Sequence, residues 1–131
     1  MFQSGFICIC GLPGIGSVGK VAADFLATSL QCSTIKSFFS PGFPPQVMVS
    51  EGLAKLMHGE LMRPREREKL LILSGDAQPL DVLGMYSLAG EILQALKEQG
   101  VTDVITLAAY VGENTEKVLG AATDLNFAAT L

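Results

Sequence analysis

The most distinctive chemistry in the sequence belongs to residues 11–20, which read Gly-Leu-Pro-Gly-Ile-Gly-Ser-Val-Gly-Lys. Residues 14–19 match the G-x-G-x-x-G pattern of dinucleotide-binding turns, and residues 14–20 match the G-x-x-x-x-G-K pattern of phosphate-binding loops. Such turns hold a phosphate on backbone N–H groups at the start of a helix. The segment therefore suggests a phosphate or nucleotide site on Gly14, Gly16, Ser17 and Lys20.

Each of these two patterns lacks its second requirement. A dinucleotide site needs an acidic residue at the end of the next strand, but residues 35–40 read Ile-Lys-Ser-Phe-Phe-Ser. A phosphate-binding loop needs a Ser or Thr hydroxyl for magnesium where this chain has Val21. The other explanation is that the glycines permit a tight turn and close packing of the helix. We favour this explanation and keep an enzyme-like phosphate site as the alternative.

A second candidate site consists of polar residues that follow predicted strands. These residues are Asp76, Gln78, Glu113 and Asn114. The carboxyl ends of parallel strands share one edge of a sheet, so these residues, with Lys20, Tyr86 and Tyr110, are candidates for one pocket. The alternative is that Asp76 and Gln78 satisfy backbone donors around the turn before Pro79, and we favour that role.

The remaining reactive residues predict neither catalysis nor a bound metal. His58 precedes Gly59 at a predicted turn, where we expect a surface residue away from the pocket. Cys8, Cys10 and Cys32 form no metal-ligand pattern. Cys8 and Cys10 are two residues apart in an apolar run, so we expect buried, reduced thiols on one side of a strand. We predict no catalytic residue, cofactor or metal site.

Composition limits the class of protein. Hydrophobic residues make up 49% of the 131 residues and charged residues 17%, against about 25% in an average soluble domain. The net charge of −4 provides no basic surface for nucleic acid. Residues 1–19 are uncharged, but glycines and a proline interrupt them and no basic segment precedes them, so they predict neither signal peptide nor membrane span. We expect one cytoplasmic domain without membrane or nucleic-acid partners.

The pattern of apolar runs predicts the elements that would position these residues. We expect strands at 6–10, 34–39, 70–73, 104–111 and 118–122, and helices at 17–31 and 82–98. Ser17 is the predicted N-cap of the first helix, and Gly100 the left-handed residue after the second. Residues 47–49 and 53–62 predict antiparallel strands with a turn at His58-Gly59, and residues 63–69 a charged connector.

This order of elements predicts an α/β fold, a doubly wound, mostly parallel sheet with an antiparallel hairpin insertion. Residues 124–131 resemble a helix cap followed by two turns, and the chain then stops. We therefore expect a single domain, 1–131, that is truncated at its C-terminal side.

An aromatic and proline-rich loop offers a possible interface. Phe38, Phe39 and Phe43 flank it, and Pro44 and Pro45 stiffen it. The phenylalanines either seal the core beneath the loop or form an exposed surface for another subunit or partner. The sequence leaves these two explanations open.

Several motifs in order give a family resemblance. They are residues 11–19, residues 40–47 (Ser-Pro-Gly-Phe-Pro-Pro-Gln-Val), residues 71–79 (Leu-Ile-Leu-Ser-Gly-Asp-Ala-Gln-Pro) and residues 84–86 (Gly-Met-Tyr). Together they resemble the archaeal or bacterial type of the proteasome assembly chaperone family, and they match about the first half of a usual member. The resemblance implies a phosphorylase-like fold, homo-oligomers and binding to proteasome core-particle subunits. It favours a non-enzymatic protein-binding module, although the last three residues, Ala129-Thr130-Leu131, do not match the hydrophobic–Tyr–any tail that some members use.

Overall fold

The computed structural model describes residues 5–113 and 117–131 of the chain. Its helical elements are η1 (Ile15–Ser17), a 3₁₀ turn, and the helices α1 (Val18–Ser29), α2 (Val82–Glu98) and α3 (Leu125–Ala128). Its strands are β1 (Phe6–Gly11), β2 (Ser33–Phe38), β3 (Val47–Ser50), β4 (Leu53–Leu56), β5 (Gly59–Arg63), β6 (Leu70–Gly75) and β7 (Val101–Thr106). None of the described helices is long and apolar enough to cross a membrane.

Five strands form one sheet in the order β2-β5-β6-β1-β7. Strand β1 is parallel to both β6 and β7, whereas β5 is antiparallel to both β2 and β6. The sheet is therefore mixed, and its parallel part is the half that contains β1. The α/β class and the separate antiparallel hairpin of the prediction are confirmed.

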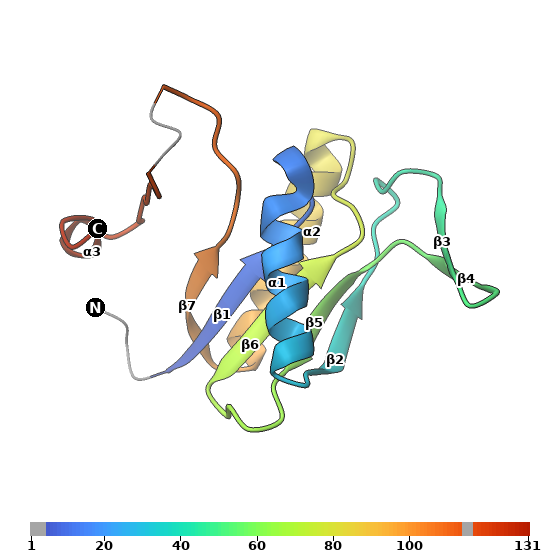
Figure 1. Cartoon of the computed structure of the whole chain (residues 1–131), viewed down its shortest axis with the longest axis horizontal. Helices are drawn as coiled ribbons and strands as arrows, with labels where there is room; N and C mark the ends of the chain where they lie inside the picture. Colours follow the sequence, from blue (N-terminus) through green and yellow to red (C-terminus); the bar gives the residue numbers. More distant parts are fainter. Residues whose placement is uncertain (1–4, 114–116) are drawn as a thin grey trace.

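The two long helices cover opposite faces of this sheet (Figure 1). Helix α2 places Leu88, Ile92 and Leu96 against one face, because residues four apart share one side of a helix. Helix α1 covers the other face with the small residues Gly19 and Ala23. The core therefore has two layers, one on each side of β1 and β6.

Local sequence explains where the second helix begins and ends. Asp81 is the N-cap of α2, and its Oδ1 accepts a hydrogen bond of 3.2 Å from the backbone N–H of Gly84. Gly100 follows the helix with φ +78, which confirms its predicted left-handed conformation. Ser17 is the N-cap residue of α1, as predicted, but it has φ 52 and its side chain makes no capping hydrogen bond.

The hairpin differs from the prediction in the place of its turn. Strands β3 and β4 form a two-stranded sheet that projects from the body of the molecule (Figure 1). The turn lies at Glu51-Gly52, both with positive φ, and not at His58-Gly59. Gly59 instead begins β5, so the predicted strand 53–62 is two strands that belong to different sheets.

The C-terminal third also differs from the prediction. Strand β7 covers residues 101–106 and not 104–111, because its neighbour β1 ends after Gly11 and the pairing stops at Cys10↔Thr106. Residues 118–122 form no strand. Asp124 caps α3 by accepting a hydrogen bond of 2.9 Å from the Phe127 N–H, as predicted, but the helix has a single turn.

Candidate functional site

The glycines of residues 11–20 bring the first helix close to the sheet. A Cβ on Gly11 would overlap the backbone oxygen of Gly19, and a Cβ on Gly19 would overlap the backbone oxygen of Leu107. Gly16 has φ +60, a left-handed conformation that glycine adopts without strain. Close packing and a tight turn thus account for Gly11, Gly16 and Gly19, which supports the explanation that we favoured from the sequence.

Lys20 is engaged within its own helix. Its Nζ forms an ion pair of 2.8 Å with Oδ2 of Asp24, one turn further along α1. The other carboxylate oxygen of Asp24 accepts a hydrogen bond of 2.5 Å from the buried Ser74 hydroxyl on β6. The lysine therefore belongs to a network that ties α1 to the sheet. Asp24 and Ser74 were absent from the predicted site.

The loop after β6 contacts the glycine-rich segment, as the predicted pocket requires. Gln78 Nε2 donates a hydrogen bond to the backbone oxygen of Pro13. Asp76 does satisfy a backbone donor, but the donor is the N–H of His58, at 3.2 Å, and not one near Pro79. The backbone N–H of Asp76 in turn donates to the backbone oxygen of His58 at 2.9 Å.

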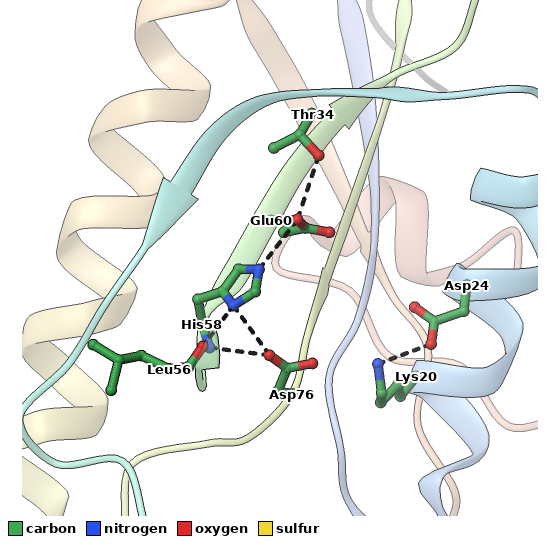
Figure 2. A network of polar contacts seen from close by, with 7 residues as sticks. All are labelled: Lys20, Asp24, Thr34, Leu56, His58, Glu60 and Asp76. Atoms are coloured by element: carbon green, nitrogen blue, oxygen red, sulfur yellow. Dashed lines mark hydrogen bonds and ion pairs between the residues drawn. The ribbon is translucent and has the colours of Figure 1, made fainter. Parts of the chain in front are cut away.

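His58 is the main residue that the sequence prediction misplaced, because it lies beside Asp76 and not away from it (Figure 2). The antiparallel register pairs Gly59 with Gly75, which brings the preceding His58 next to the following Asp76. Its Nδ1 lies 2.9 Å from the backbone oxygen of Leu56 and 3.2 Å from Asp76 Oδ2. Its Nε2 lies 3.1 Å from Glu60 Oε1.

The residues around His58 form a cluster, and they come from four strands or from the residues next to them. Thr34 on β2 donates a hydrogen bond of 3.4 Å to the same Glu60 oxygen that contacts the ring. Leu56 ends β4, Glu60 lies on β5, and Asp76 follows β6. In the described ranges, no group of three or more His, Cys, Asp or Glu side chains is arranged to hold a metal ion. The cluster is therefore a hydrogen-bonded junction of strands.

Other members of the predicted pocket are not joined to this cluster. Tyr86 on α2, Tyr110 and Glu113 are exposed, and within residues 5–113 and 117–131 they add no hydrogen bond or ion pair to it. Asn114 lies outside the described residues. The structure thus unites Asp76 with His58, Gln78 with Pro13, and Lys20 with Asp24.

The predicted interface residues divide between the core and the surface. Phe38 is buried in the core under α2, and Phe43 packs partly against that core. Phe39, Pro44 and Pro45, together with Phe43, help to line an open groove of about 790 Å³, whose lining also includes Val47 and Leu56 of the hairpin. Phe38 thus seals the core, whereas the role of the exposed residues of the loop in binding a subunit or partner stays a prediction.

The hairpin adds an apolar surface next to this groove. All eight residues of β3 and β4 are exposed. Directly opposed residues share one face of an antiparallel pair, and the pairs Val47↔Leu56 and Val49↔Ala54 are entirely apolar. We call these four residues the hairpin face. It is continuous with the groove, since Val47 and Leu56 belong to both.

Cys8 and Cys10 are buried and face the same side of the sheet, as predicted. Cys8 and Cys10 both lie in the core under α2, while Cys32 is half-buried. Burial, and then the neighbouring Cys10, raise the pKa of Cys8 to about 12, and burial raises the pKa of Cys10 to about 11. Because the thiolate is the reactive form, neither thiol reacts readily at neutral pH.

The chain is thus a mixed α/β domain. Its glycine-rich turn packs the first helix closely, and its hairpin stands apart from the main sheet. Residues 8–131 match the PAC2 family, and the chain belongs to that family. The predicted resemblance to the proteasome assembly chaperone family is confirmed.

Individual relatives show how much of a family member this chain spans. It is 37% identical to an uncharacterized protein, MJ1210, of Methanocaldococcus jannaschii over 129 residues, which are 95% of this chain and 50% of that protein. It is similar to Pyrococcus furiosus PbaB, an archaeal proteasome activator, with a TM-score of 0.69 and 32% identity over 86% of this chain and 52% of PbaB. It also resembles P. furiosus PbaA, an archaeal homolog of proteasome-assembly chaperone, with a TM-score of 0.56 and 29% identity over 76% of this chain and 42% of PbaA. The chain thus spans about half the length of these relatives.

Proposed function

We propose that this chain is a non-enzymatic protein-binding module that associates with itself and with subunits of the proteasome core particle. The relatives PbaA and PbaB, which are named for proteasome assembly and activation, support the choice of partner. The phosphorylase-like topology and the cytoplasmic location that we expected from the sequence belong to the same proposal.

The observation that carries the proposal is the exposed hairpin face beside the aromatic groove. Val49 and Leu56 are 68% and 66% exposed, and the groove adds Phe39, which is 55% exposed. Contiguous apolar surface of this kind marks sites of protein–protein contact, and aromatic side chains contribute strongly to binding. A two-stranded hairpin is also marginally stable by itself in water, so a partner that covers it would stabilise both.

A pair of matched variants tests the hairpin face as the binding surface. Val49→Lys places a charge at the centre of the hairpin face. Val21→Lys makes the same change on the outer side of α1, where the valine is 63% exposed. Binding to proteasome α-subunits is measured by pull-down and titration, and self-association by size exclusion with light scattering at tens of micromolar. We expect Val49→Lys to weaken binding about tenfold or more, since a desolvated, unpaired charge is costly at an interface, while Val21→Lys binds like the wild type.

Each result has a separate meaning. Equal binding by Val49→Lys and the wild type would remove the hairpin face from the proposal. Absence of any α-subunit binding by the wild-type chain would remove the proteasome partner. A strict monomer at these concentrations would remove self-association, because oligomers are favoured by mass action as concentration rises.

A further inference from the structure

His58 lies where both ends of the hairpin segment meet the sheet. The segment leaves the sheet after Phe38, at the end of β2, and rejoins it at Gly59, the first residue of β5. The rings of Phe39 and His58, one at each end, have centroids 5.8 Å apart. One imidazole ring therefore contacts both connections between the sheet and residues 39–58.

The ring nitrogens of His58 both face hydrogen-bond acceptors. Nδ1 faces the Leu56 carbonyl and the Asp76 carboxylate, and Nε2 faces the Glu60 carboxylate (Figure 2). Carbonyl and carboxylate oxygens accept hydrogen bonds, and a neutral imidazole carries a single N–H. Only the protonated ring donates on both sides at once, so its neutral form must give up one side of the junction.

We propose that His58 is a pH-sensitive latch, whose protonated form fastens the hairpin segment to the sheet on both sides of the ring and whose neutral form loosens it by giving up one of these contacts. The charged groups that face the ring are Glu60 on β5 and Asp76 after β6, and both are acidic. The other contacts, from Leu56 on β4 and Phe39 after β2, are uncharged. Among the contacts described, two elements place a carboxylate against the ring and none places a positive charge there, so the facing charges favour the imidazolium. The latch concerns how the hairpin is anchored, whatever partner the hairpin face binds.

The direction of the pKa shift sets the pH range of the latch. Burial lowers the pKa of His58, but the hydrogen bonds to Leu56 and Glu60 and the charges of Asp76 and Glu60 outweigh it, so the pKa lies above 6.5. A group with a raised pKa in the folded state contributes its full stabilisation below the pKa of the unfolded chain. That contribution is lost as pH rises through the folded pKa. The latch is therefore closed in mild acid and opens on the alkaline side of 6.5.

Two measurements on the intact chain test the latch. The sequence contains one histidine, so an NMR titration of the imidazole protons reports His58 alone. Hydrogen exchange, corrected for the intrinsic effect of pH, then compares residues 47–58 with β6 from about pH 5.5 to 8.5, the range in which histidine changes charge. We expect a midpoint above 6.5, and hairpin exchange that increases about threefold or more across it while exchange in β6 stays constant.

Variants separate the latch from a general effect of pH. His58→Gln should leave hairpin exchange fast and independent of pH. Glu60→Gln should lower the midpoint of His58, because it removes one facing charge, and should move the onset of fast exchange to lower pH by the same amount. Glu98→Gln makes the same change on α2, where Glu98 accepts a hydrogen bond from Gln94, and should leave the midpoint unchanged.

Three results would overturn the latch. One is a midpoint at or below 6.5, and another is hairpin exchange with the same pH dependence in His58→Gln and the wild type. If His58→Gln does not fold, equal midpoints in Glu60→Gln and the wild type would serve as the third.

Discussion

Strand β6 and the β3–β4 hairpin consist of similar side chains in opposite surroundings. Five of the six residues of β6 are buried, whereas all eight residues of the hairpin strands are exposed. Strand β6 has a strand on each side and a helix over each face of its sheet, but β3 and β4 pair only with each other among the described strands. An apolar strand is therefore buried by the elements that assemble around it, and its own composition does not determine whether they do.

The largest effect should come from removing a side chain of β6. Leu71 is fully buried, pairs in register with Cys8, and packs in the core under α2. We expect Leu71→Ala to lower the free energy of unfolding by about 2–5 kcal/mol, through lost burial and the cavity that remains. Urea denaturation measures the change. A loss below about 1 kcal/mol would show that β6 is less tightly packed than the comparison requires.

A smaller effect is expected where the backbone itself is in close contact. In Gly19→Ala, the new Cβ would overlap the backbone oxygen of Leu107, so α1 must shift away from the sheet. We expect a loss of about 1–3 kcal/mol, the usual range for overpacking.

The matched control for this change is Gly90→Ala, since Gly90 lies in α2 with no atom near its would-be Cβ. There we expect a gain of about 0.5–1 kcal/mol, because alanine is the better helix former. Equal changes at both positions in thermal or urea unfolding would contradict the role of glycine packing at α1.

The smallest effect on stability should come from the hairpin. Leu53 is 64% exposed on β4, so Leu53→Ala repeats the chemical change of Leu71→Ala without burial. We expect the free energy of unfolding to stay within about 0.5 kcal/mol of the wild type, as is usual for surface substitutions. The measurement is the same urea denaturation, at a dilution where the chain is monomeric. A loss comparable to that of Leu71→Ala would mean that the hairpin is covered in the isolated chain.

Periodicity predicted the elements that pack on both sides. The predicted bounds of helix α2 agree with the structure at both ends, and the predicted strand 70–73 begins where β6 begins but ends two residues before it. The predicted second strand and first helix, 34–39 and 17–31, also agree with β2 and α1 to within two residues. These assignments depended on local pattern alone.

The junction at His58 could not be predicted in this way. Its position beside Asp76 depends on the register of two strands, Gly59 opposite Gly75, and on recognising that β5 is separate from β4. The exposed Glu51-Gly52 pair was the available signal for the hairpin turn, since turns of this kind favour a glycine with positive φ. With the turn there, Val47 pairs with Leu56, so the hairpin ends at Leu56 and residues 59–63 form a separate strand.

The order of strands in the sheet has a consequence for how the chain reaches its fold. Strand β1 precedes both of its neighbours by many residues in the sequence, since Ile7 pairs with Leu70 and Phe6 with Val101. Contacts between such distant residues carry a loop-closure cost and slow folding. Strand β1 therefore cannot form its parallel pairs until β6 and then β7 have been synthesised, and until then its apolar side chains lack their neighbours in the sheet.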